Sequence, residues 1–288
     1  MNGIEIKNVS KQYKNVAALE GVTLTFAPGK IYGLLGRNGA GKTTLLNIIA
    51  SRIFASGGTV TIDGENAVEN MRVHDKIFCM SEQDLYSPAL KVRDHFKWTA
   101  RFYEGFNLER AHEIAALFGL DERKKFKALS KGYQSIFKLT VALALDVPYV
   151  IFDEPVLGLD ANNRELFYKL LLEKYEREGN TLIIATHLIE EVANLIEDVV
   201  LIDHGKVLLS ENVEVLLSQG YTVSGFAGDV DRYCMDKRVI GVDNLGGLKL
   251  AYVLGARTPA PEGVNLQFTA LNLQKLFVKL TEAEEGAS

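Results

Sequence analysis

The first chemically suggestive segment is a glycine-rich loop, which runs from Gly36 to Thr43 as GRNGAGKT. It fits the pattern G-x-x-x-x-G-K-[ST], whose backbone amides curl around phosphates. In such a loop the lysine reaches the β- and γ-phosphates and the following hydroxyl meets Mg²⁺, so we expect these roles for Lys42 and Thr43. The residues expected to bind the nucleotide here are Gly36, Asn38, Gly39, Ala40, Gly41, Lys42, Thr43 and Thr44.

A pair of acids, Asp153 and Glu154, ends the apolar run 149–152. Phosphoryl transfer depends on positioning and charge, and the metal beside the phosphates needs a carboxylate. We therefore expect Asp153 to support Mg²⁺ and Glu154 to polarise the attacking water. An isolated Asp-Glu pair is often only the solvated end of a strand. Together with a phosphate loop, however, the pair favours nucleotide hydrolysis.

The segments around the phosphate loop predict the elements that must hold it. Residues alternate between apolar and polar over 4–9 and 21–26, which is the period of half-buried strands. The nearly continuous apolar run 30–35 is typical of a strand covered on both faces, and 42–50 has the apolar pattern of a buried helix. The loop therefore lies between a buried strand and a helix, which disfavours its alternative interpretation as a glycine-rich turn with a surface lysine.

Further along the chain, predicted helices and strands alternate. Helices are expected over 107–118, 133–145 and 163–178, and buried strands over 149–152 and 181–185. Alternation of this kind predicts an α/β fold with a parallel sheet.

The sequence pattern changes beyond about residue 214, where short segments of alternating apolar and polar residues are separated by Gly and Pro. Strands are expected at 221–226, 239–242, 248–254 and 264–269, with helices at 229–237 and 271–280. This pattern predicts a separate small α+β domain. The apolar stripe of its last helix is too wide for a solvent-exposed tail, so we expect it to bury either within its own domain or against a twin domain across a dimer.

Composition limits the possible classes of protein. With 288 residues, 47% apolar and 24% charged, the chain has the make-up of one large or two ordinary globular domains. Its apolar runs are far shorter than the roughly 20 residues of a membrane span, so no segment is expected to cross a bilayer alone. A net charge of -5 gives no electrostatic reason to expect nucleic acid as a partner. The two cysteines lack metal-ligand spacing, which favours a reducing cytoplasm.

A second motif, Leu-Ser-Lys-Gly-Tyr-Gln at residues 129–134, starts the amphipathic helix. Over about residues 3–210 the sequence resembles the ATPase subunits of ATP-binding-cassette (ABC) transporters, whose Leu-Ser-Gly-Gly-Gln signature binds the γ-phosphate on the opposite subunit. Ser130 and Gly132 match this signature, whereas Lys131 and Tyr133 depart from it. A plain serine N-cap is the alternative interpretation. The spacing favours the signature, because Ser130 lies 23 residues before Asp153 as in the family.

The resemblance implies roles for further residues. Asp160 falls in the D-loop that crosses the dimer interface, and His187 is similar to the switch histidine that touches the γ-phosphate. Tyr13 resembles the aromatic residue that stacks on adenine, although an ordinary edge-strand tyrosine is the alternative. The family's Q-loop glutamine senses Mg²⁺ and couples to the membrane subunit. Its place falls on Glu82, which we favour, with Gln83 in reserve; both are candidates for catalysis and for metal binding.

The resemblance also implies the P-loop NTPase fold of ABC ATPases, with an antiparallel β subdomain and a helical subdomain. We expect an ATPase domain over 1–213, its helical subdomain over about 84–145, and a C-terminal α+β accessory domain over 214–288. The implied protein binds ATP and Mg²⁺ and works as a head-to-tail homodimer, or with a paralogous ATPase subunit. It drives a separate transmembrane permease, which docks near 90–119, from the cytoplasmic face of the cell membrane.

The direction and the cargo are expected from the resemblance alone. The C-terminal ending at 268–281 is similar to ATPases of bacterial exporters, and with the signature it resembles those that expel amphipathic or antimicrobial peptides, such as phenol-soluble modulins. An alternative is a non-transport ABC ATPase of translation, DNA repair or regulation. The repair type inserts a long coiled coil between phosphate loop and signature, yet only 86 residues separate Thr43 from Ser130. Phosphate-loop kinases and switch GTPases leave the signature and His187 unexplained, and the chain lacks an Asn-Lys-x-Asp guanine motif.

Overall fold

The computed structural model describes residues 2–83, 86–260 and 263–285, with side chains through residue 281. The chain forms two compact units. Unit 1 comprises Met1–His187 and Val200–Leu209, and unit 2 comprises Leu188–Val199 and Ser210–Ser288. The expected division into domains at residue 213 stays a prediction.

A six-stranded sheet forms the centre of unit 1. From one edge to the other its strands are β10 (Lys206–Asn212), β9 (Asp198–Asp203), β3 (Ile31–Leu35), β8 (Thr181–Thr186), β7 (Tyr149–Asp153) and β6 (Ile77–Met80). Strands β3, β8, β7 and β6 run parallel, which confirms the predicted parallel sheet. Every residue of these four strands is buried. Their carboxyl ends meet at one edge, where open α/β sheets hold their ligands.

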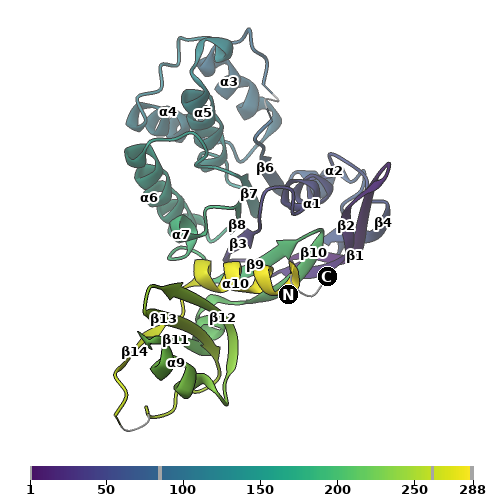
Figure 1. The fold of residues 1–288 in the computed structure, drawn as a ribbon. Coiled ribbons are helices and arrows are strands. Elements are labelled where there is room, and N and C mark those ends of the chain that lie inside the picture. Colours follow the sequence, from purple (N-terminus) through teal and green to yellow (C-terminus); the bar gives the residue numbers. More distant parts are fainter. Residues whose placement is uncertain (1, 84–85, 261–262, 286–288) are drawn as a thin grey trace. The chain divides into compact units, whose positions relative to one another are not determined.

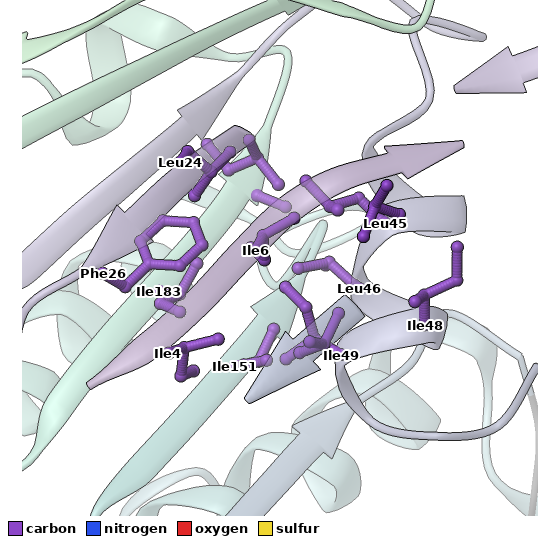
Figure 2. Close-up of a cluster of buried hydrophobic side chains, with 14 of the residues drawn as sticks. Ile4, Ile6, Leu24, Phe26, Leu45, Leu46, Ile48, Ile49, Ile151 and Ile183 are labelled. Carbon is purple, nitrogen blue, oxygen red and sulfur yellow. The ribbon is translucent and has the colours of Figure 1, made fainter. Parts of the chain in front are cut away.

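A second, antiparallel sheet has the order β2 (Val16–Phe26), β1 (Ile4–Tyr13), β4 (Gly57–Ile62) and β5 (Glu65–Asn66). Figure 2 shows how α1 (Lys42–Ile49) contributes Leu45, Leu46 and Ile49 to one core with this sheet and with the parallel sheet. The helix that follows the phosphate loop is therefore fixed by apolar packing on both sheets.

Helices α3 (Val92–Phe102), α4 (Leu108–Leu117) and α5 (Lys131–Leu143) gather into one bundle in unit 1 (Figure 1). Its core is aromatic: the rings of Phe96 and Phe137 stack with centroids 5.7 Å apart. Shorter helices are α2 (Met71–His74) and the 3-10 turn η1 (Phe126–Ala128). The expected start of this subdomain, at residues 84 and 85, lies outside the described residues. Helix α6 (Ala161–Glu178) packs Phe167 on Phe152 of β7, with centroids 5.5 Å apart.

Unit 2 contains a four-stranded antiparallel sheet, as its alternating segments predict. The order is β12 (Arg238–Leu245), β13 (Leu248–Leu254), β11 (Gly220–Phe226) and β14 (Leu266–Ala270). Helices α7 (Ile189–Val192), α8 (Val213–Ser218), α9 (Ala227–Cys234) and α10 (Leu273–Glu285) complete the unit. Val230 and Tyr233 of α9 pack into a small core with both central strands.

The C-terminal helix α10 buries its apolar stripe inside unit 2. Leu273, Leu276 and Phe277 are buried, and the helix contacts β12 and α7. Lys279 Nζ forms an ion pair with Asp243 Oδ1 of β12 at 2.8 Å. Of the two partners expected for the stripe, its own unit is therefore the one that covers it. Among the described residues, no helix is long and apolar enough to span a membrane.

Candidate active site

The phosphate loop connects the carboxyl end of β3 to α1, and its glycines are required by its geometry. Gly41 has φ 108°, where side-chain-bearing residues are strained, and a Cβ there would lie 2.7 Å from the carbonyl oxygen of Ala18. A Cβ on Gly36 would lie 2.4 Å from the carbonyl oxygen of Ile202. The loop is thus wedged between β2 and β9, and these close approaches restrict its shape.

The Lys42 side chain lies inside this loop. Its Nζ donates hydrogen bonds to the carbonyl oxygens of Gly36 (2.7 Å) and Arg37 (3.2 Å). It also lies 3.4 Å from Glu154 Oε1, with both side chains largely buried. The ammonium group therefore sits at the centre of the loop, where the pattern predicts that it meets phosphate.

Asp153 ends β7 with 2% of its surface exposed, and Thr43 Oγ1 donates to its Oδ1 at 3.3 Å. Burial raises the pKa of Asp153 to about 6; the Thr43 hydrogen bond and Lys42 oppose this shift, whereas the negative charges of Glu154 and Glu82 add to it. A carboxylate that is desolvated and faces two like charges is a favourable place for a cation. The hydroxyl and carboxylate that the sequence assigns to the metal are thus in contact.

The described part of the chain holds no group of three or more His, Cys, Asp or Glu side chains placed to bind a metal. A fully protein-coordinated metal centre is therefore not the arrangement seen here. Mg²⁺ in nucleotide enzymes takes only one or two protein oxygens, and phosphates and waters supply the rest. Thr43 and Asp153 fit that mode of binding.

Glu154 has φ 48°, in the left-handed region that non-glycine residues rarely adopt. Its backbone N–H donates to Ala185 O at 2.9 Å, and its Oε2 accepts from Thr186 Oγ1 at 3.1 Å. His187 Nδ1 lies 3.0 Å from its Oε1. Backbone strain of this kind is commonly found at functional sites, where the surroundings hold it in place. The structure thus brings His187 and Lys42 together around the carboxylate of Glu154.

The two Q-loop candidates face different cavities. Glu82 lines a cavity of about 260 Å³ together with Asp153 and Glu154. Gln83 instead lines a neighbouring cavity of about 200 Å³ with Arg52. The geometry therefore brings Glu82, and not Gln83, towards the metal-site carboxylate.

The signature and D-loop residues lie at helix starts. The Ser130 side chain caps α5 by accepting from Tyr133 N at 3.3 Å, and Asp160 caps α6 by accepting from Asn163 N at 2.9 Å. A Cβ on Gly132 would lie 3.1 Å from Gly158 O, so the two segments approach closely. Neither Ser130, Gly132 nor Asp160 lines the cavity that contains Asp153. Within one chain, their observed contacts are those of caps and close packing.

Tyr13 lies at the end of β1 with 45% of its surface exposed. Lys11 Nζ lies 5.0 Å from the centre of its ring. The tyrosine is thus accessible for stacking, as its expected role requires, but the other contacts of the site do not involve it.

Sequence reasoning missed two residues of the site, Thr186 and Lys138. Thr186 binds the Glu154 carboxylate, and Lys138 lines both cavities. Lys138 carries the clearer signal, because it is a charged residue within the apolar pattern of a buried helix.

The raised pKa of Asp153 predicts that its charge costs stability. We expect Asp153→Asn to raise the free energy of unfolding of the nucleotide-free protein by about 1 to 3 kcal/mol at pH 8. The folded protein binds the Asp153 proton up to about pH 6. The unfolded chain releases that proton near pH 4, so the gain should shrink by about half at pH 5. Denaturant unfolding of both proteins at pH 5 and pH 8 measures this, and a pH-independent difference would contradict it.

Comparison with known proteins agrees with these observations. Residues 19–157 match the family model described as ABC transporter. The ABC transporter ATP-binding protein NatA of Bacillus subtilis (strain 168) is 31% identical over 238 residues, covering 80% of this chain and 94% of NatA. The Nod factor export ATP-binding protein I of Burkholderia lata is 26% identical, covering 98% of this chain and 97% of that protein.

A solved dimeric structure of the ATP-binding cassette MJ0796, in a post-hydrolysis state bound to ADP and Pi, is 27% identical. It superposes with a TM-score of 0.66 over 73% of this chain and 98% of that one. The α/β fold of ABC ATPases expected from the sequence is thereby confirmed. With its phosphate loop at the end of β3 and its acidic pair at the end of β7, the chain belongs to the ABC transporter ATP-binding proteins, a family of ATP-hydrolysing cassettes.

Proposed function

We propose that this ATPase works as a head-to-tail dimer and drives a separate transmembrane permease in the direction of export. The observation that carries the catalytic part is the position of Glu154, whose carboxylate contacts His187 and Lys42 next to the buried Asp153. A carboxylate held between the phosphate-loop lysine and a histidine is suited to orient water towards a phosphoryl group.

Each residue then has a defined task. The loop amides and Lys42 bind the phosphates, while Thr43 and Asp153 hold Mg²⁺, which neutralises charge on the phosphate oxygens when bound. Glu154 orients the attacking water and accepts its proton. His187 donates a hydrogen bond from Nδ1 to the Glu154 carboxylate, in the tautomer that carries the Nδ1 proton, and so keeps that carboxylate aimed.

A dimer explains why Ser130 and Asp160 do not line the cavity that contains Asp153 of their own chain. Ser130 starts α5 with its hydroxyl and the first backbone amides of a 13-residue helix, and such a helix start binds anions. In a head-to-tail arrangement it serves the nucleotide on the partner chain, as does Asp160 across the interface. Two composite sites per dimer follow from this arrangement.

The permease has a candidate docking surface on the helical bundle. A groove of about 500 Å³ is lined by several aromatic and histidine side chains, among them Tyr86, His95, Trp98 and Phe102. Trp98 and Phe102 expose 46% and 73% of their surfaces, and their rings stack with centroids 6.1 Å apart. Exposed aromatic pairs are typical of the energetic centre of protein interfaces. The groove includes residues of the region expected to meet the permease, 90–119, and this supports docking of the ATPase at the cytoplasmic face of the membrane.

The proposed export direction is supported by the length of the alignment with one relative, an export ATP-binding protein. Relatives named for import and relatives named for export both occur among the matches. The Nod factor export protein aligns with 98% of this chain, so the alignment includes unit 2 as well as the cassette. We infer that the chain shares its two-part organisation with an export ATPase; the peptide cargo remains an expectation from the resemblance.

Loss of the aromatic pair tests the docking surface. We expect the double variant Trp98→Ser, Phe102→Ser to recover at least about 10-fold less membrane partner from detergent-solubilised cells, because exposed aromatic anchors carry much of an interface's energy. ATP hydrolysis by the isolated subunit should not change. Phe54→Ser is the matched control, since Phe54 is 61% exposed and lies outside the groove.

The identity of the recovered partner tests the proposed function itself. A polytopic membrane protein that depends on Trp98 and Phe102, and that moves solute outward when reconstituted with ATP, is the expected result. Ribosomal or DNA-bound partners would favour the non-transport alternative. Equal recovery with all three proteins would contradict the docking surface.

A further inference from the structure

Helix α5 carries a lysine where its packing calls for an apolar residue. Its residues from Ile136 to Leu143 are all buried, most of them apolar, and Lys138 among them is only 5% exposed. Burying an ammonium group costs several kcal/mol unless hydrogen-bond acceptors surround it. The position of Lys138 therefore depends on the acceptors that it finds.

Two of these acceptors belong to consecutive residues of the Q-loop. Lys138 Nζ donates to the carbonyl oxygen of Glu82 at 2.6 Å and to that of Gln83 at 3.2 Å. The loop is also turned on itself, because Gln83 N donates to Ser81 Oγ at 3.2 Å. A side chain 56 residues away in sequence thus holds the backbone of the loop that follows β6. An ammonium group suits this task, since it is compact and carries three donors.

The location of these bonds gives them a consequence for the site. Lys138 lines the cavity that contains Glu82 and Asp153 and also the neighbouring cavity that contains Gln83. It therefore lies in the wall between the two. If the loop backbone moved, the Glu82 side chain could leave the first cavity. The Glu82 side chain would then no longer line the cavity that it shares with Asp153.

We propose that Lys138 is a positioning residue, which pins the backbone of Glu82 and Gln83 to α5 and so keeps the Glu82 carboxylate beside Asp153. Because α5 begins at the signature serine, the same bonds join the signature helix to the Q-loop within one chain. The effect on catalysis rests on the proposed function, whereas the pin itself does not.

Unit 1 contains a matched control. Lys174 of α6 is 1% exposed, and its Nζ donates to the carbonyl oxygen of Leu145 at 2.6 Å and pairs with Glu178. It lines neither of the two cavities. Lys174→Met therefore removes a similarly buried ammonium group without touching the Q-loop, and Lys138→Met removes the pin.

The first measurement needs no nucleotide. Amide hydrogen exchange of Glu82 and Gln83 should become at least about 10-fold faster in Lys138→Met, because the loop loses its anchor, and should stay at the wild-type rate in Lys174→Met. Unchanged exchange in Lys138→Met overturns the proposal. Equal acceleration in both variants overturns it too, since that result reports general destabilisation. If Lys138→Met does not fold, Lys138→Gln, which retains a donor on a shorter side chain, undergoes the same comparison.

The second measurement separates binding from turnover. Lys138→Met should lower kcat by about 10-fold or more while the Kd for ATP changes by less than about 3-fold, because the pin acts on metal-site geometry and not on the phosphate loop. Lys174→Met should keep the wild-type kcat. Fast exchange with a normal kcat would overturn the positioning role. Absence of ATPase activity in the wild-type protein would count against the proposed function. The hydrogen-exchange experiment would still test whether Lys138 anchors the Q-loop backbone.

Discussion

Glu154→Gln should bind ATP as tightly as the wild type and hydrolyse it at least about 100-fold more slowly, which is the contribution of a general base. Glutamine keeps the shape of the side chain and can still contact His187, but it cannot accept the proton of the attacking water. ATP therefore stays intact, and the ATP-bound dimer should accumulate. Phosphate release, ATP affinity and sedimentation with ATP measure the three expectations.

Glu178→Gln is the control for this variant. The two side chains are similarly enclosed, with 10% of Glu154 and 12% of Glu178 exposed, and each lies next to a buried lysine. Only Glu154 lies beside Asp153 in the cavity of the site. Glu178→Gln should therefore keep its turnover, and normal turnover in Glu154→Gln would remove that residue from the reaction.

A mixture of Lys42→Ala and Ser130→Arg chains should regain hydrolysis that neither chain has alone. In a head-to-tail heterodimer one composite site carries both defects, while the other pairs an intact phosphate loop with an intact signature. Equal mixing gives about half heterodimers with one good site each, so we expect about a quarter of wild-type activity.

The control for this experiment is a mixture of two separately prepared Lys42→Ala samples, which should stay inactive. Purified heterodimers carrying two affinity tags remove the uncertainty of random pairing. Absence of activity in such heterodimers, with ATP still bound at one site, would contradict independent composite sites.

The parts of the site that sequence could predict are those encoded by short, contiguous patterns. The phosphate loop is eight consecutive residues between a strand and a helix, and Asp153 and Glu154 end a buried strand. Hydrophobic period and local turn chemistry are sufficient for such segments. Strands β3, β7 and β8 and the sheet of unit 2 were predicted for the same reason.

Other features depend on contacts between distant segments, which a local pattern does not encode. The Glu154–His187 contact joins residues 33 positions apart, and the Lys138 bonds to the Q-loop join residues 55 and 56 positions apart. Which of Glu82 and Gln83 lines the cavity of Asp153 likewise depends on the three-dimensional position of the loop, because only Glu82 of the two lines that cavity. Strands β4, β5, β6, β9 and β10 also escaped prediction, and the short strands β5 and β6 offer only two and four residues over which a period can be recognised.

Unit 2 is formed by two separate segments of the chain, and this determines how it can be removed or exchanged. Its first segment, Leu188–Val199, follows His187 directly and contributes α7, whose Ile189 and Val192 are buried and which contacts α10 at the other end of the chain. Truncation of the chain near residue 213 would remove α10 but leave α7, whose buried apolar side chains would become exposed to solvent within a few residues of His187. Exchange of unit 2 between relatives, in the laboratory or in evolution, therefore requires two junctions and not one.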